Sequence, residues 1–74
     1  MQVSAQYLEG IREGRKLLNW WKRDGFLHRD LIAREIESLE RLRAKLAPLA
    51  YSAGEVEFFD GQIDFFRNQL KVSC

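Results

Sequence analysis

VEFFDGQIDFF, residues 56–66, is the stretch that decides the fold, because it fits both a hairpin and a helix. Asp60-Gly61 between two apolar runs is a strong hairpin signal. With these residues as the turn, however, Glu57 would face Asp64, and like charges opposite each other destabilise a strand pair. A lone two-stranded hairpin is only marginally stable, and the sequence shows no third strand. The hairpin is therefore the weaker interpretation.

The helical interpretation accounts for more of the same residues. EFFDGQI and DFFRNQL align as two heptads, and apolar residues recur at the three- and four-residue spacing of one helix face. Gly61 falls on the opposite side, where we expect it to face solvent and to cost roughly 1 kcal/mol relative to alanine. The buried face is predicted to consist of Val56, Phe59, Ile63, Phe66 and Leu70.

Signals just before this stretch also predict a helix, over residues 53–71. Ser52 and Glu55 have the S-x-x-E spacing of a capping box, in which each side chain satisfies the other's backbone N–H. Tyr51 and Val56 are spaced for the hydrophobic contact that accompanies such a cap.

Two further helices are predicted upstream, over about residues 4–23 and 28–47. Ser4 is a suitable N-cap for the first, and Gly25 suits its C-terminal cap. Pro48 ends the second, because proline disfavours helical geometry at the preceding residue. Their buried faces are predicted to contain Tyr7, Ile11, Gly14, Leu17, Leu18 and Trp21, and Ile32, Ile36, Leu39, Leu42 and Leu46. On the solvent side of the second helix, acidic and basic residues pair at i,i+4, as Asp30 with Arg34 and Glu37 with Arg41.

The whole chain, residues 1–74, is thus predicted to be a single all-α domain. Its three short helices could form either a helical hairpin with a third helix or a three-helix bundle. A chain of this length buries only about 60% of its unfolded surface and is marginally stable alone. Residues 1–29 contain six Lys and Arg against three acidic residues, whereas residues 52–74 contain two against four. We therefore expect a homodimer, in which an antiparallel partner brings its acidic third helix to the basic first helix.

Composition argues against several classes of function. His28 and Cys74 are the single histidine and the single cysteine, so we expect neither an internal disulfide nor a metal site. The sequence has no glycine-rich phosphate loop, and His28 has no nucleophile beside it. We predict a non-enzymatic protein with no catalytic residue and no cofactor. The single cysteine predicts a reducing, cytoplasmic compartment. The sequence shows no signal peptide and no apolar run of about 18 residues, so we expect no membrane span.

Surplus aromatic residues are the main functional signal. Phe58 and Phe65 lie more than roughly 100° round the third helix from its apolar face, so they need a surface of their own. That surface is either the core or an interface. Trp20 is expected to be partly exposed, because its neighbour Trp21 already belongs to the buried face. Large exposed apolar groups mark interaction surfaces, and we predict Trp20, Tyr51, Phe58 and Phe65 as partner anchors.

The first helix carries two other candidate features. Gly10 and Gly14, four residues apart, leave a smooth surface that permits close packing, either against the second helix or against the first helix of a second subunit. Arg12, Arg15 and Lys16 are expected to steer an acidic partner.

QYLEGIREGRKLL, the charged LERLRAKLAPLA segment and the short capped third helix together resemble small accessory proteins of temperate bacteriophages. The chain is similar in style to the helical early-region proteins that bind and inhibit host proteins, including quorum-sensing anti-activators. This resemblance implies a helical dimer, located in the bacterial cytoplasm, that binds and occludes a host regulatory protein.

The alternative function is a small nucleic-acid-binding transcriptional regulator. Lys22, Arg23 and Arg29 cluster near two tryptophans, and basic residues with aromatic side chains can bind single strands. However, the chain is close to neutral, with a net charge of +1. A broad basic surface is therefore missing.

Overall fold

The computed structural model describes residues 4–25, 28–49 and 53–72. It contains α1 (Ala5–Asp24), α2 (Arg29–Leu46) and α3 (Ala53–Val72). The all-α prediction is confirmed, because the described part of the chain forms three helices and no strand. The predicted bounds differ from these by no more than one residue, and residues 56–66 lie inside α3. Tyr51 and Ser52 of the predicted capping box lie outside the described residues.

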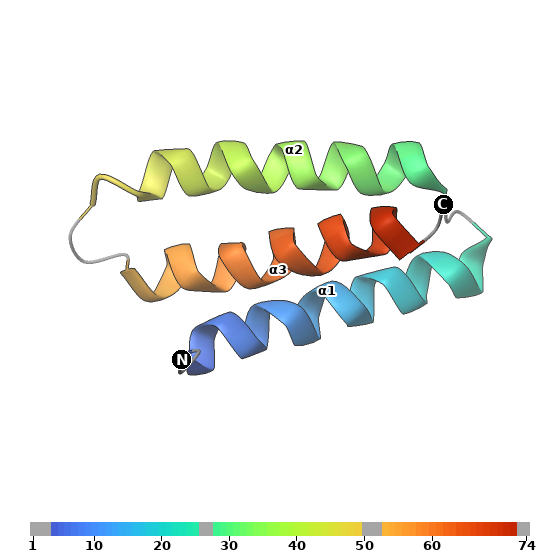
Figure 1. Cartoon of the computed structure of the whole chain (residues 1–74), viewed down its shortest axis with the longest axis horizontal. Coiled ribbons are helices and arrows are strands. Elements are labelled where there is room, and N and C mark those ends of the chain that lie inside the picture. Colours follow the sequence, from blue (N-terminus) through green and yellow to red (C-terminus); the bar gives the residue numbers. More distant parts are fainter. Residues whose placement is uncertain (1–3, 26–27, 50–52, 73–74) are drawn as a thin grey trace.

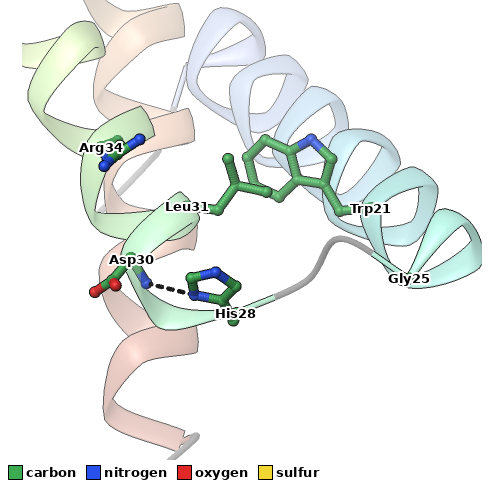
Figure 2. A pocket seen from close by; sticks show the side chains of 6 residues that line it. All are labelled: Trp21, Gly25, His28, Asp30, Leu31 and Arg34. Carbon is green, nitrogen blue, oxygen red and sulfur yellow. Dashed lines mark hydrogen bonds between the residues drawn. The ribbon is translucent and has the colours of Figure 1, made fainter.

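Local sequence sets the helix ends. The Ser4 Oγ accepts a hydrogen bond from the Tyr7 N–H at 3.1 Å, which caps α1 as predicted. Gly25 ends α1 with φ of 77°, a left-handed conformation that favours glycine. At the start of α2, the imidazole of His28 is the cap, because its Nδ1 accepts from the Asp30 N–H at 3.3 Å (Figure 2).

The third helix lies between the other two (Figure 1). α1 and α3 run in the same direction, and α2 runs antiparallel to both (Figure 1). Each of the outer helices packs along α3, whereas α1 and α2 make only sparse contact with each other. The third helix in the sequence is therefore the central helix of the fold, with neighbours on two sides.

The hydrophobic core follows the contact of α3 with both neighbours. The Phe66 side chain has no exposed surface, and the Trp21 ring stacks on it with centroids 5.6 Å apart. The buried apolar residues are Leu18, Ile32, Ile36, Leu39, Ile63 and Phe66. Leu42 was predicted to be buried, and this is wrong, since 46% of it is exposed. The side of α2 that carries Leu42 is left open because α1 does not close over it.

The closest contact in the fold joins α1 and α3 at glycines. A Cβ added to Gly61 would overlap the Tyr7 carbonyl oxygen and would lie 3.1 Å from the Gly10 Cα. A Cβ added to Gly10 would overlap the Phe58 carbonyl oxygen and would lie 3.0 Å from the Gln62 N. The two backbones therefore touch, which side chains at these positions would prevent.

This contact corrects two expectations. Gly61 was predicted to face solvent, and it is instead buried against α1. Gly10 and Gly14 do lie at a close contact between helices, but they face α3 rather than α2 or a second subunit. The Phe65 ring lies over Gly14, where it would be 2.9 Å from an added Cβ.

Polar contacts tie the three helices together beside the core. The Tyr7 hydroxyl of α1 donates to the Asp64 carboxylate of α3 at 2.6 Å. Asp60, one turn earlier on α3, accepts a hydrogen bond from Arg43 of α2. Arg67 and Glu40 form a further ion pair between α3 and α2, at 3.3 Å.

Of the two predicted pairs within α2, Arg41 and Glu37 meet at 2.9 Å. Asp30 and Arg34 form no ion pair within the described part.

Loss of the Tyr7 hydrogen bond is expected to change how stability depends on pH. Donation to Asp64 raises the pKa of Tyr7 above its ordinary value, and partial burial adds to this. The folded state therefore favours the neutral phenol, so this contribution is complete below about pH 10 and is lost as the pH rises through the folded pKa. Tyr7→Phe is expected to lower the free energy of unfolding by up to about 1 kcal/mol at pH 8.

Urea unfolding of both proteins at pH 8 and pH 11 checks this prediction. The difference between wild type and Tyr7→Phe should shrink at pH 11, where ionised Tyr7 would face the Asp64 carboxylate. An equal difference at both pH values would contradict the assigned hydrogen bond. Tyr51→Phe is a useful comparison, since it removes the other tyrosine of the chain.

Candidate functional site

The single histidine of the chain has a structural role. His28 caps α2 through Nδ1. Within the described residues, no three His, Cys, Asp or Glu side chains gather closely enough to hold a metal ion. None of the described helices has the length and apolar character needed to cross a membrane. The candidate site is therefore sought among the surfaces that the helices leave open.

Among the described residues, Trp20 is the most exposed large apolar side chain, at 57%. Its neighbour Trp21 turns inward and stacks on Phe66. Successive residues of a helix point about 100° apart, so a pair of adjacent tryptophans divides between the core and the surface. The predicted exposure of Trp20 is confirmed.

A hollow of about 240 Å³ lies directly beside Trp20. It is lined by Glu13, Lys16, Leu17 and Trp20 of α1 and by Gln62 of α3. The four α1 residues have the spacing i, i+3, i+4, i+7, which is the spacing of the four residues that receive a side chain from a neighbouring helix in knobs-into-holes packing. This spacing is visible in the sequence and could have indicated Glu13 and Leu17 as site residues, whereas Gln62 joins them only through the packing of α3 on α1.

Gln62, one of the lining residues, has an unsatisfied polar atom. Its Oε1 is sealed from solvent and has no hydrogen-bond donor among the described residues. A buried acceptor without a donor costs about 1–3 kcal/mol. A donor that enters the hollow could reach this amide, because the terminal torsion of glutamine turns over a broad range.

Phe58 and Phe59 lie on α3 outside the lining of this hollow, and Phe59 packs against the hydrophobic core. They lie about one turn before Gln62, one on each side of it. Both are half-buried, and their rings pack edge to face with centroids 5.9 Å apart. We call Leu17, Trp20, Phe58 and Gln62 the aromatic face.

The other predicted partner-binding residues are placed differently. Phe65 packs edge to face on Phe66 at 5.5 Å and lies over Gly14, so its ring is used mainly within the chain. Tyr51 lies outside the described residues.

The predicted steering cations are partly neutralised within α1. Arg12 pairs with Glu9 at 3.0 Å, and Lys16 pairs with Glu13 at 3.3 Å. Arg15 has no ion pair within the described part of the chain, so it is the strongest of the three candidates for attracting an acidic partner.

Comparisons with known proteins assign no family to the chain. No protein-family model, no curated protein and no solved structure matches it. The resemblance to phage accessory proteins gains no support from these comparisons. The aromatic face is the feature that bears most directly on function.

Proposed function

We propose that this chain is a non-enzymatic protein-binding module that receives a helix of another protein on its aromatic face. The observation that carries the proposal is the hollow beside Trp20, because four residues of α1 surround it at the spacing of a knobs-into-holes contact. An apolar side chain of the partner helix would fill this hollow, and Trp20 would pack beside it.

Burial of Trp20 supplies much of the expected affinity. Tryptophan is enriched among the few interface residues whose truncation costs 2 kcal/mol or more. With 57% of the residue exposed in the chain alone, most of that apolar area is still available to a partner. Phe58 would extend the apolar contact, and the Gln62 Oε1, which is buried without a donor, would have to turn outward to accept a hydrogen bond from the partner.

The narrower form of the proposal concerns the identity of the partner. A phage-encoded inhibitor would use the aromatic face to occlude a host regulatory protein in the bacterial cytoplasm. This form rests on the resemblance of the sequence to phage accessory proteins. Arg15 would then assist encounter with an acidic partner, an effect that added salt weakens.

We also propose that the chain forms a homodimer. The support for this is the opposite charge of the outer helix α1 and the central helix α3. Asp60 and Asp64 are already engaged by Arg43 and Tyr7, so the acidic residues of α3 that are left for a second copy are Glu55 and Glu57. Sedimentation equilibrium over a hundredfold range of concentration tests this: a mass of 8.7 kDa throughout would contradict it.

The binding proposal is tested by affinity capture from nuclease-treated bacterial lysate with matched variants. Wild type should retain a protein at constant stoichiometry, and Trp20→Ala should lose at least about tenfold in affinity for it. Leu8→Ala is the control, because Leu8 is also on α1 and is 53% exposed, but it does not line the hollow. Equal loss from both variants would contradict the assignment of the aromatic face.

The same capture tests the alternative of a nucleic-acid-binding regulator. Phosphate-driven binding falls steeply with added salt. The regulator becomes the proposed function if two results are found together. Capture must occur from untreated lysate and be lost after nuclease treatment. The double variant Lys22→Gln with Arg23→Gln must lose binding while Trp20→Ala keeps it.

A further inference from the structure

Two Asp-Gly links occur in the chain, Asp24-Gly25 and Asp60-Gly61. Such a link can rearrange without a catalyst, because the backbone nitrogen of the glycine can attack the carboxyl carbon of the aspartate and close a five-membered ring. Glycine favours this attack, since it has no Cβ to shield its nitrogen and it allows a wide range of backbone angles. In a folded chain, the surroundings of each link decide whether the ring can form.

Asp60-Gly61 is held in the middle of α3, between the two outer helices (Figure 1). The Asp60 carboxylate accepts a hydrogen bond from Arg43 of α2. Gly61 is buried, and an added Cβ would overlap the Tyr7 carbonyl oxygen of α1. To bring the Asp60 carboxyl carbon onto the Gly61 nitrogen, the backbone must leave the helical conformation, which requires α3 to separate from its neighbours. Ring closure at this link therefore requires opening of the core.

Asp24-Gly25 lies at the end of α1, where such restraints are weak. Both residues are exposed, and within the described part of the chain the Asp24 carboxylate makes no hydrogen bond or ion pair. A Cβ added to Gly25 would meet no atom within 4 Å. The Gly25 N–H caps the helix by donating to the carbonyl oxygens of Trp21 and Lys22, the latter at 3.3 Å. Helix ends open at almost no cost in free energy, so this link can reach the geometry of ring closure while the core stays folded.

We propose that Asp24-Gly25 is a site of spontaneous isomerisation in the folded protein, whereas Asp60-Gly61 is protected. The Gly25 nitrogen forms a bond to the Asp24 Cγ, and its proton leaves with the hydroxyl group of the protonated carboxyl as one molecule of water. The product is a cyclic succinimide. Water then adds to one of the two ring carbonyl carbons and opens the ring. Addition at Cγ restores aspartate, and addition at the main-chain carbonyl carbon gives isoaspartate, in which the backbone runs through the former side chain.

Isoaspartate at residue 24 would change the end of α1. The backbone between Arg23 and Gly25 gains one carbon atom, so the Gly25 N–H moves away from the carbonyl oxygens that it caps. Trp21 lies in this last turn and stacks on Phe66, so the rearrangement would act on the core from the helix end. The site does not depend on the aromatic face, and either proposal can fail without the other.

Ageing of the intact chain tests the assignment. Wild type is kept folded at pH 7 and 37 °C, and a second sample is kept unfolded in guanidinium chloride. After protease digestion, the peptides that contain residues 24 and 60 are separated from their isoaspartate isomers by chromatography and identified by mass spectrometry. For each link, the rate of isomerisation in the folded protein is divided by the rate in the unfolded protein. This ratio is expected to be at least about tenfold larger for Asp24-Gly25 than for Asp60-Gly61, because helix ends open far more often than a core.

Two further measurements make the test specific. In water enriched in heavy oxygen, each ring opening inserts one solvent oxygen, so the isoaspartate peptide should carry it. Asp24→Glu is the matched variant, because it keeps the carboxylate but would need a six-membered ring, which closes far more slowly. No isomer should then accumulate at residue 24, while residue 60 behaves as in wild type. The proposal is overturned if the two ratios are equal, if the ratio for Asp60-Gly61 is the larger, or if isoaspartate at residue 24 lacks solvent oxygen. It is also overturned if folded wild type forms no isoaspartate at residue 24 in the time in which the unfolded chain converts most of it.

Discussion

Gly61→Ala is expected to destabilise the fold by about 2 kcal/mol, although alanine is the better helix former. The propensity of alanine should contribute about 1 kcal/mol in favour of the variant. Against this, the new Cβ would overlap the carbonyl oxygen of Tyr7. Backbone cannot turn away as a side chain can, so α1 must move off α3. Overpacking costs typically 1–3 kcal/mol and occasionally more, and we expect the upper end here.

Other glycines of the chain are matched controls for this prediction. At Gly54 an added Cβ would lie 3.4 Å from the Cγ of Gln6, a flexible side chain. Gly54→Ala is therefore expected to be neutral or to stabilise the protein by up to about 1 kcal/mol. Gly25→Ala meets no atom within 4 Å, but its φ of 77° is unfavourable for alanine, which should cost about 1 kcal/mol.

Urea unfolding followed by circular dichroism compares these variants at one temperature. The expected order of stability is Gly54→Ala, wild type, Gly25→Ala, Gly61→Ala. If Gly61→Ala were as stable as Gly54→Ala, the backbone contact between α1 and α3 would be wrong. Gly10→Ala should behave like Gly61→Ala, and because the two residues meet at one crossing, their costs should not add.

Phe66→Ala is expected to have the largest effect of any single substitution, a loss of about 3–5 kcal/mol. Phe66 is the side chain with no exposed surface, and it contacts the rings of Trp21 and Phe65. A domain of 74 residues has a total stability of roughly 4–11 kcal/mol. A chain of this size is expected near the lower end of that range, so the variant should be largely unfolded or loosely packed at 37 °C.

The comparison with Phe58→Ala makes this prediction specific. Phe58 is half-buried and belongs to the aromatic face, so its removal should cost clearly less stability while weakening partner binding. Near-ultraviolet circular dichroism reports the packing of the Trp21 ring on Phe66. Retention of that signal in Phe66→Ala, with an unfolding midpoint close to that of wild type, would show that α3 is not the centre of the core.

The helices and their ends could be predicted because they depend on local interactions. Ser4, Gly25 and Pro48 act on backbone groups within one turn, and a three- and four-residue apolar spacing identifies a helix without knowledge of its neighbours. The same spacing placed Ile63 and Phe66 in the core. It also separated Trp20 from Trp21, since 100° per residue cannot bury both on one face.

The burial of Gly61 and the exposure of Leu42 were not predicted, because both depend on how the helices pack against one another. The apolar spacing of α3 indicated one buried face, whereas α3 has a helix on each side. Gly61 is therefore buried although it lies opposite the apolar residues, because absence of a side chain is what lets α1 approach. Leu42 is exposed because α1 makes only sparse contact with α2 and does not cover the side of α2 that carries it. A periodic pattern shows which residues avoid water, but not how many neighbours a helix has.

The sequence by itself determined the three helices of the described part of the chain, where they begin and end, and which residues form most of the core. These properties follow from hydrogen bonds and side-chain directions within a few residues of each other. The tertiary structure decided that α3 is central, that Gly10 and Gly61 meet backbone to backbone, and that Gln62 completes the hollow beside Trp20. Those contacts join residues well apart in the sequence, from 17 positions for Arg43 and Asp60 to 51 for Gly10 and Gly61. Their geometry is set by which surfaces pack most closely rather than by any local preference.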